Sequence, residues 1–443
     1  MKIQLSEHFT YTKFIKFIIP SIIMMIFTSI YGIVDGLFVS NFVGKTAFAA
    51  LNLIWPFPML LGSVGFMFGT GGSAIVAKTL GEGKTDVANR HFSLIIYTTI
   101  ILGVAASVLG IVFIEKIAHL LGADEAMLHN CVIYGRILLI GLPAFMMQNV
   151  FQSFLIAAER PDLGLYVTIA AGITNMVLDA VLVGILKWGI SGAGYATILS
   201  QFVGAIIPLY FFISNKNAQL KLTKAKLDFS VLIKATTNGS SELLTNMSLS
   251  LVNILYNFQL MKFVGENGVA AYGVIMYVAF IFIAIFLGFS FGSAPIISFN
   301  YGANNTAELK NVFNKSIKLI GIFSVAITGI AIALSGALSK IFVGYDEQLL
   351  NLTIRGLKLY SMNFLFVGFN IFASSFFTAL NNGLVSAIIS FFRTLLLQIV
   401  TVLILPEILG IDGIWIAIVV AEAIALIVSV SFLYGKRKEY KYM

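Results

Sequence analysis

The stretch that decides the fold is FIKFIIPSIIMMIFTSIYGIVDGLFV, residues 14–39, an apolar run whose only acid is Asp35. At about 1.5 Å per residue, a helix of this length crosses the roughly 30 Å hydrocarbon core of a bilayer. A charge inside such a helix costs at least ~2.5 kcal/mol and usually marks the path of an ion or a substrate. We therefore expect a membrane-spanning helix whose acid faces protein or water.

The rest of the chain has the same composition. Of 443 residues, 59% are hydrophobic and 11% are charged, and the mean hydropathy is +0.96, whereas charged residues make up about 25% of soluble domains. This composition predicts an all-α membrane protein without an appended soluble domain. The first apolar run follows no cleavage signature, so it is expected to be a retained helix rather than a signal peptide.

Charge and cysteine content exclude several classes of partner. The net charge is +8, but the basic residues are scattered through short loops, which favours contact with the anionic headgroups of the lipid bilayer over nucleic acid. The single Cys131 permits no internal disulfide. The four histidines lack metal-ligand spacing, so no structural metal is expected.

Hydropathy predicts twelve transmembrane helices. They span residues 14–39, 48–77, 91–114, 131–157, 163–186, 189–213, 231–261, 268–297, 312–336, 352–379, 384–406 and 411–434. The seventh prediction is the weakest, because that span is rich in Ser, Thr and Asn and contains Glu242. A helix this polar must face protein or water rather than lipid.

The distribution of basic residues predicts the orientation in the cell membrane. With the N-terminus inside, one side of the membrane receives 19 Lys and Arg residues and the other receives 7. Because positive residues favour cytoplasmic loops, both termini are expected in the cytoplasm.

The two halves of the chain repeat one another. Adding 221 to the residue number carries Gly44 to Gly265, Gly71 to Gly292, Gly81 to Gly302, Gly135 to Gly356, Gly189 to Gly410 and Gly192 to Gly413, where chance would give roughly two coincidences. Each half holds six spans, so the pseudo-twofold axis runs along the membrane normal. The sequence predicts an N-lobe (1–213), a basic cytoplasmic linker (214–230) and a C-lobe (231–443) that ends in a basic tail. Two such six-helix bundles around a central cavity are typical of alternating-access transporters.

Four helices of the first half each have a polar face, because polar residues recur at helical spacing. These faces hold Met24, Thr28, Tyr31 and Asp35 on the first helix, Phe145, Gln148, Asn149 and Gln152 on the fourth, Thr168, Gly172, Asn175 and Asp179 on the fifth, and Ala193, Thr197 and Gln201 on the sixth.

Five of these residues form a candidate cation site in the outer half of the N-lobe. At ~1.5 Å per residue, Asp35, Asp179, Thr197 and Asn175 lie ~8, ~10, ~12 and ~16 Å from the outer ends of their spans. With the carbonyl of Ala193 they make an all-oxygen set suited to a hard cation such as Na⁺. The two carboxyl groups could instead share a proton. The sequence does not choose between Na⁺ and H⁺.

A structural alternative is that both aspartates are satisfied polar residues that fix the register of the helices. Their matched depth on facing polar stripes argues against this interpretation. Pro20 removes one backbone hydrogen bond from the first helix and so gives it a place to bend. The alternative for Pro20 is an inert kink near the cytoplasmic end.

These residues carry a family resemblance. The run from Pro20 to Gly44, with YGIVDGLFVSNFVG at residues 31–44, and the pair Asn175 and Asp179 followed by Thr197 resemble the multidrug and toxic compound extrusion (MATE) transporters. That family has two six-helix lobes. The chain is most similar to its prokaryotic branch, whose N-lobe holds a cation site.

The resemblance implies roles for individual residues. Asp35, Asn175, Asp179, Ala193 and Thr197 would bind the cation, and Pro20 would be the point where the first helix bends during transport. Tyr31, Asn149 and Gln152 would line the adjoining drug cavity, and the polar faces of the first half add Met24, Thr28 and Gln201. The C-lobe has its own polar stripe on the seventh helix, from which Asn253 would face Asn370, and these two residues are also expected in the cavity. Another branch of the family carries an ion site on acids of the seventh and tenth helices. Here Glu242 lies too near the cytoplasmic end and span 352–379 has no acid, so no C-lobe ion site is expected.

The C-lobe holds one more charged pair. Arg393 and Glu422 are expected at about the same depth in neighbouring spans. We interpret them as a buried ion pair that stabilises the lobe. The alternative is that Arg393 contacts an acidic group of a substrate.

The sequence therefore predicts a monomeric secondary transporter, not an enzyme, that exports bulky cationic amphipathic drugs in exchange for Na⁺ or H⁺ and needs no other cofactor. One alternative is a flippase of a lipid-linked intermediate, which would need a more strongly cationic cavity. A polytopic membrane enzyme is a further alternative, but the sequence holds no nucleophile motif and no paired His and acid.

Overall fold

The chain folds into long helices. The computed structural model describes residues 3–215 and 218–443, apart from the side chains of Leu37, Ser40, Asn41 and Lys45. The helices are α1 (Tyr11–Phe42), α2 (Lys45–Ile54), α3 (Pro56–Gly81), α4 (Thr85–Leu120), α5 (Glu125–Ala157), α6 (Pro161–Leu178), η1 (Asp179–Ile185), α7 (Gly189–Ser214), α8 (Phe229–Phe263), α9 (Glu266–Gly302), α10 (Thr306–Val343), α11 (Glu347–Ser361), α12 (Phe364–Ala379), α13 (Gly383–Phe391), η2 (Phe392–Leu396), α14 (Leu397–Leu409) and α15 (Ile411–Tyr440). The elements η1 and η2 are π-helical turns inside longer helices.

Twelve crossings account for these helices, which confirms the predicted fold class. Ten are long and apolar enough to span a membrane by themselves, and the pair α11 and α12, bent by 47°, makes an eleventh. The twelfth is α8, which is 35 residues long. It is less apolar than the other crossings because it contains many Ser, Thr and Asn residues. Asn238, Ser241 and Ser248 of α8 are buried against other parts of the protein, whereas Ser250 and Asn257 are exposed.

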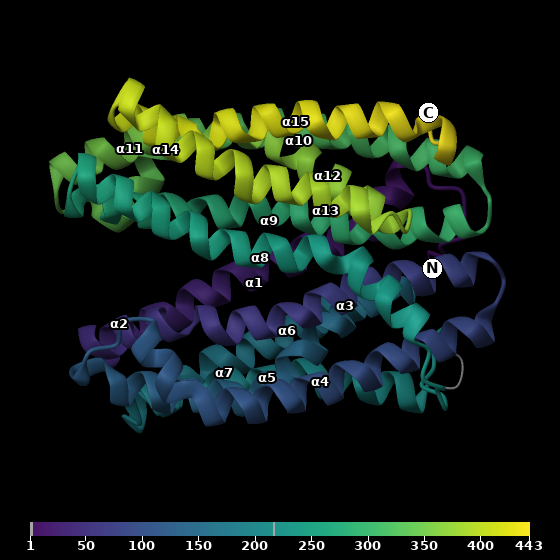
Figure 1. Cartoon of the computed structure of the whole chain (residues 1–443), viewed down its shortest axis with the longest axis horizontal. Coiled ribbons are helices and arrows are strands. Elements are labelled where there is room, and N and C mark those ends of the chain that lie inside the picture. The colour runs from purple at the N-terminus through teal and green to yellow at the C-terminus, as the bar shows by residue number, and fades with distance from the viewer. Residues whose placement is uncertain (1–2, 216–217) are drawn as a thin grey trace.

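The helices form two lobes, α1–α7 and α8–α15, which lie side by side in Figure 1. Backbone conformation repeats between them at the offset of 221 found in the sequence. Gly44 and Gly265 precede α2 and α9 with φ of 109° and 81°. Gly189 is the first residue of α7 and Gly410 precedes α15, with φ of 60° each. Because an L side chain rarely adopts this conformation, glycine is needed at both members of each pair.

Close contact between the lobes is concentrated where both chain termini lie, the right-hand end of Figure 1, here called the termini end. We call the contact of α1 and α3 with α8 and α9 the seam. Six glycines allow the backbones to touch there: Gly71, Gly81, Gly239, Gly288, Gly292 and Gly302. A Cβ on Gly81 would collide with the carbonyl oxygen of Phe299, and one on Gly302 with that of Lys78. These two contacts are related by the same offset of 221, so the seam is itself pseudo-symmetric.

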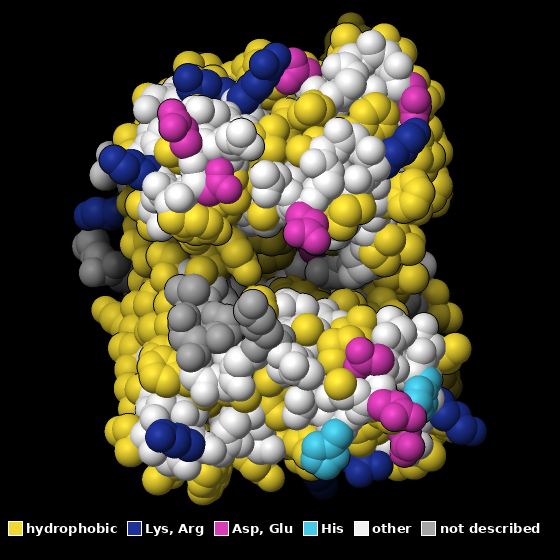
Figure 2. Space-filling view, turned by 90° about the vertical axis from the view of Figure 1, so that its left-hand side faces the viewer, with side chains coloured by type: hydrophobic (Ala, Val, Ile, Leu, Met, Phe, Trp, Pro, Cys, Tyr) yellow, Lys and Arg dark blue, Asp and Glu magenta, His cyan; other side chains and the backbone are white. Residues whose placement is uncertain are grey.

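The opposite end of the molecule is hollow. Figure 2 views this end and shows a depression between the two lobes. In Figure 1, α1 and α8 diverge toward this end after crossing near the seam. The structure is therefore closed at the termini end and open at the opposite end.

The helix α1 connects these two regions. Its first half packs into the main apolar core of the C-lobe through Phe14, Phe17 and Ile18, all buried. Its second half lies against α6, where Gly172 makes room for the rings of Phe27 and Tyr31. A single helix thus reaches from the seam to the interior of the N-lobe.

Three spans differ from the sequence prediction, and one of them, 163–186, ends in the π-helical turn η1. Residues 352–379 were expected to form one helix, but a break after Ser361 separates α11 from α12. The Asn363 side chain donates a hydrogen bond to the carbonyl of Tyr360 and so competes with the helical backbone bonds at the break. In span 384–406, the turn Phe392–Leu396 is π-helical, which periodicity does not reveal.

Candidate functional site

Asp35 and Asp179 come together inside the N-lobe, as the matched depths predicted. Asp35 lies on α1, seven residues before its end at Phe42, and Asp179 is the first residue of η1. Their carboxyl groups are close enough to interact directly. The approach is possible because α1 lies against the glycine face of α6 at Gly172.

Three of the four carboxyl oxygens of this pair are buried without a described hydrogen-bond donor. The Asp179 side chain is fully buried (0% exposed), and neither of its oxygens makes a hydrogen bond. Asp35 is half-buried, and its Oδ1 is likewise buried without a partner. A buried carboxylate without a counter-charge is strongly disfavoured. Two adjacent ones are stable only with a proton or a cation between them.

The other expected ligands add free acceptor oxygens. Asn175, one helical turn before Asp179, is 2% exposed, and its Oδ1 has no described hydrogen-bond partner. The Thr197 hydroxyl on α7 donates to the carbonyl of Ala193 at 3.0 Å, which leaves the lone pairs of the hydroxyl available. The five predicted residues carry carboxylate, amide, hydroxyl and carbonyl oxygens on α1, on α6 with η1, and on α7. That they bind one cation together stays a prediction.

The backbone at Asp179 is unusual. Here α6 widens into the π-helical turn η1, and the amide of Asp179 bonds to both the Asn175 and Met176 carbonyls. Such π-helical turns inside α-helices occur often at functional sites. The wider turn changes the direction of the side chains that follow it, which the spacing rules of an α-helix cannot predict.

Sequence reasoning missed one residue of this site, Tyr134 on α5. Its side chain is fully buried, its hydroxyl has no hydrogen-bond partner in the described part of the chain, and it lies near Asp35, Asp179 and Thr197. A signal was present, because Tyr134 lies eleven residues before Phe145 and so extends the polar face of that helix.

The residues expected to line a drug cavity lie in different surroundings. Tyr31, Thr28, Gln152 and Asn253 are half-buried, whereas Asn149 and Gln201 are buried and each keeps one polar atom without a described partner. Met24 is 1% exposed and belongs to the apolar core. Asn370 is fully buried within the C-lobe, away from any open surface.

Asn370 belongs to a polar network that includes the expected ion pair. Arg393 on η2 donates to Glu422 on α15 at 2.9 Å. The Asn370 amide donates to the other Glu422 oxygen at 2.7 Å and accepts from Ser429 at 2.7 Å. Every oxygen of Glu422 therefore has a partner, in contrast to the two aspartates of the N-lobe.

What this arrangement can do follows from its oxygens. No described group of three or more His, Cys, Asp and Glu residues has the arrangement of a metal site. A monovalent cation does not require one, because a carboxylate with neutral oxygens is a sufficient ligand set for Na⁺. The N-lobe cluster can therefore bind Na⁺ or share a proton.

Known proteins resemble this chain over nearly its whole length. The MatE family model matches twice, at residues 20–181 and 243–404, once in each lobe. "Multidrug export protein MepA" of Staphylococcus saprophyticus is 23% identical over 94% of this chain and 92% of its own length. The protein of the same name from Staphylococcus haemolyticus is 22% identical over 97% and 95%.

Solved structures share the fold. One is described as the "Outward-facing conformation of a multidrug resistance MATE family transporter of the MOP superfamily", with a TM-score of 0.92, 23% identity and coverage of 97% of this chain and 96% of that one. A MATE structure in a bent conformation gives a TM-score of 0.88, 23% identity and coverage of 97% and 95%.

Proposed function

This chain belongs to the MatE family, and from that premise we propose that it exports bulky cationic compounds in exchange for Na⁺ or H⁺ by alternating access. Family membership makes it a multi-pass membrane transporter and not an enzyme. The observation that carries the ion-coupling proposal is the adjacent pair Asp35 and Asp179, three of whose four carboxyl oxygens are buried without a described hydrogen-bond donor.

The coupling cation binds between the two aspartates. Asn175 and Thr197 add neutral oxygens, and the Ala193 carbonyl already lies beside the Thr197 hydroxyl. If the ion is H⁺, one carboxyl group takes the proton and donates it to the other. Either ion removes the repulsion between two adjacent negative charges.

The termini end faces the cytoplasm of the cell in this proposal. The support is the excess of Lys and Arg, 19 against 7, in the segments at that end. The hollow in Figure 2 then opens to the outside of the cell membrane. In this state the transported compound leaves and the cation enters.

Ion and drug binding are coupled through α1. This helix carries Asp35, and its cytoplasmic half forms the seam, where Gly288 touches the backbone at Ser21 and Ile22. Pro20 lies inside α1 at this contact and leaves one backbone carbonyl without its helical partner. Bending of α1 at Pro20 on cation binding would shift both the seam and the polar face that holds Thr28 and Tyr31. Antiport requires only that cation and drug stabilise different states.

The transported compounds are bulky and cationic. Support comes from the relatives named multidrug export proteins and from the half-buried Tyr31, Thr28, Gln152 and Asn253. Aromatic and amide side chains bind such cations through ring faces and carbonyl oxygens. In this proposal the transporting unit is a monomer.

The direct test is transport in proteoliposomes. Ethidium movement is followed after a Na⁺ gradient, a H⁺ gradient or neither is imposed, and Na⁺ is replaced by K⁺ at fixed pH. One gradient is expected to drive transport, and Asp35→Asn is expected to abolish that dependence. The control is Asp86→Asn, which removes an exposed acid from the first turn of α4. Wild-type transport by Asp35→Asn would contradict the site assignment.

A lipid flippase is the remaining alternative. It would need positive charge in the cavity to hold a phosphate, yet Arg393 is engaged by Glu422 at 2.9 Å. Scrambling of a fluorescent phospholipid or polyprenyl phosphate in the same vesicles, without ethidium transport, would favour the flippase.

A further inference from the structure

Glu242 is an acid of the C-lobe whose side chain the proposed transport cycle does not use. It lies on α8, 13 residues after the first residue Phe229, which is ~20 Å along the helix. Its backbone carbonyl accepts a hydrogen bond from Asn246. Its carboxylate is half-buried and takes part in none of the hydrogen bonds or ion pairs between described residues. An ionisable residue at this depth without a protein partner is a candidate for binding a ligand.

The Glu242 carboxylate lines a small cavity at the seam, with a volume of about 20 Å³. Both lobes contribute to its wall. Thr70, Ser73 and Ser153 come from the N-lobe, and Ser375 and Thr378 from the C-lobe. The cavity holds one small group, comparable in size to a water molecule or an ammonium.

The hydroxyl groups of this wall present acceptors to the cavity. Thr70 donates its proton to the Phe66 carbonyl at 3.0 Å, and Ser73 donates to the Thr70 carbonyl at 3.2 Å. Ser375 donates to the Ser290 carbonyl at 3.4 Å. Because these protons are already used, the lone pairs of the hydroxyl groups remain for a ligand. A carboxylate surrounded by acceptors selects a positively charged group.

Arg393 is a positively charged side chain of the C-lobe that bears on Glu242. It acts electrostatically on Glu242, but its guanidinium donates to Glu422 at 2.9 Å. Arg393 therefore already has its ion-pair partner in Glu422, and the Glu242 carboxylate makes no ion pair with a described residue. A cation in the cavity would give it one.

We propose that Glu242 and the surrounding hydroxyl groups bind a monovalent cation of ammonium size at the seam. Its source is either the charged nitrogen of an exported amine or a free coupling ion. The proposal rests on the proposed function only in that cations pass between the lobes. Because the cavity wall belongs to both lobes, separation of the lobes at the seam divides the site and releases its cation.

The test is equilibrium binding to the purified full chain with two probes, monodansylcadaverine as a fluorescent primary amine and ²²Na⁺. Glu242→Gln keeps the size of the side chain and removes its charge. Glu266→Gln, an exposed acid on the first turn of α9, is the matched control. Thermal unfolding of each variant shows that it is folded.

We expect Glu242→Gln to raise the Kd of one probe about tenfold, with Glu266→Gln unchanged. An effect on monodansylcadaverine alone identifies the exported amine as the source, and an effect on Na⁺ alone identifies the coupling ion. Unchanged binding of both probes by a folded Glu242→Gln would overturn the proposal. Failure of the proposed function looks different, because then the wild-type chain itself shows no gradient-driven transport.

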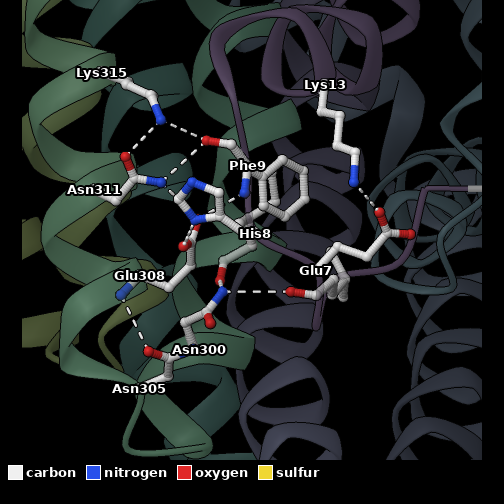
Figure 3. A network of polar contacts seen from close by, with 11 residues as sticks. Glu7, His8, Phe9, Lys13, Asn300, Asn305, Glu308, Asn311 and Lys315 are labelled. Atoms are coloured by element: carbon white, nitrogen blue, oxygen red, sulfur yellow. Dashed lines mark hydrogen bonds and ion pairs between the residues drawn. The ribbon is translucent and has the colours of Figure 1, made fainter.

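A second, independent observation concerns residues 3–10, the N-terminal strap. Figure 3 shows it lying along α9 and α10 of the C-lobe. The Phe9 amide donates to Glu308 at 2.9 Å, and His8 Nδ1 lies 2.6 Å from the other Glu308 oxygen. The Phe9 carbonyl accepts from Asn311 at 3.0 Å and from Lys315 at 2.6 Å.

The same strap also reaches the N-lobe. The Leu5 amide donates to Glu159, which follows α5, at 2.8 Å, while the Leu5 carbonyl accepts from Asn300 of α9 at 3.4 Å. The side chains of Leu5 and Phe9 are fully buried. The strap therefore joins both lobes at the closed end of the molecule, outside the seam glycines.

We infer that the strap is a latch that stabilises the state closed at the termini end. Opening that end moves α9 and α10 away from α5, and the strap cannot keep its bonds to Glu159 and to Glu308 at once. Weakening either attachment should therefore shift the population toward the state open at the termini end.

The latch can be tested by distance measurement between spin labels. Spin labels are attached at Lys84→Cys and Lys310→Cys in a Cys131→Ser background. Lys84 precedes α4 of the N-lobe and Lys310 lies near the start of α10 of the C-lobe, and both are exposed at the termini end. Glu308→Ala removes the acceptor of the strap, and Asp86→Ala, another acid at that end, is the control. We expect the long-distance population to grow several-fold in Glu308→Ala only. Identical distance distributions in the two variants would overturn the inference.

Discussion

Glu422 of the C-lobe and Asp179 of the N-lobe are both almost fully buried, but only Glu422 has partners for its carboxylate. In the C-lobe, Glu422 is 1% exposed and has partners on both oxygens, Arg393 at 2.9 Å and Asn370 at 2.7 Å. In the N-lobe, Asp179 is 0% exposed and neither oxygen has a described partner. A satisfied acid stabilises its lobe, whereas an unsatisfied one requires something from solution. The comparison distinguishes an acid whose charge is satisfied within the protein from the acid on which the proposed cation site rests.

The largest expected effect follows from removing the unsatisfied charge. Asp179→Asn should lower gradient-driven export about 100-fold, equivalent to about 2.7 kcal/mol, because the cation loses a charged ligand. The Tm without coupling ion should stay the same or rise, since a buried unpaired charge is removed. Export assays and thermal unfolding with and without the ion measure both. A variant that unfolds at lower temperature while keeping ion-driven export would reverse the assignment.

For Glu422, whose two oxygens both have partners, we expect a loss of stability rather than a loss of ion coupling. Glu422→Gln leaves Arg393 without its counter-charge and should destabilise the protein by about 3–5 kcal/mol, while ion dependence per folded molecule is retained. Because Arg393 is 12% exposed at its side chain, the value falls near the lower limit. The double variant Arg393→Met with Glu422→Leu should regain most of the lost stability. Selective loss of ion coupling in Glu422→Gln would show that the C-lobe pair is functional.

The seam offers a symmetric test of both lobes. Gly81→Ala and Gly302→Ala each place a methyl group against a backbone carbonyl of the other lobe. Both should disfavour the state closed at the termini end and slow export about tenfold, by equal factors because the contacts are pseudo-symmetric. Gly336→Ala on α10, with open space around its Cβ, is the matched control. Unequal effects of the two seam variants would mean that the lobes do not contribute equally to closure.

The smallest expected effect concerns Tyr134, the residue that the structure adds to the candidate site of the N-lobe. Tyr134→Phe removes a hydroxyl that has no described hydrogen-bond partner beside the two aspartates. Because a neutral ligand contributes less than a charged one, the apparent affinity for the coupling ion should fall about two- to fivefold. The readout is the ion concentration for half-maximal export. No change would exclude the hydroxyl from the site.

Much of this fold follows from residue patterns. Runs of apolar residues predicted the membrane-spanning helices. Repeated glycines such as Gly44 and Gly265 predicted the two lobes, because the same backbone conformation recurs in both. The depth of each residue along its span predicted that Asp35 lies near Asp179 and that Arg393 lies near Glu422. These inferences succeed because rise per residue and helix periodicity are nearly constant.

Other features could not be derived in this way. The π-helical turn at Asp179 changes the periodicity on which the prediction depends. Met24 shares a helix face with Asp35, yet it is buried in the apolar core, since α1 crosses from one lobe to the other along its length. The bonds of the strap to Glu159 and Glu308 join positions about 150 and 300 residues apart, and only tertiary packing determines such contacts.

The most direct test of the N-lobe site is the infrared difference spectrum produced when the coupling ion is added to the purified protein. Carboxyl bands report both Na⁺ coordination and protonation. The variant with Asp35→Asn and Asp179→Asn should lose a large part of the cation-induced carboxyl signal, while Glu422→Gln keeps the full wild-type signal. A spectrum of the aspartate variant that superimposes on that of the wild type would contradict the assignment of the cation to these two residues.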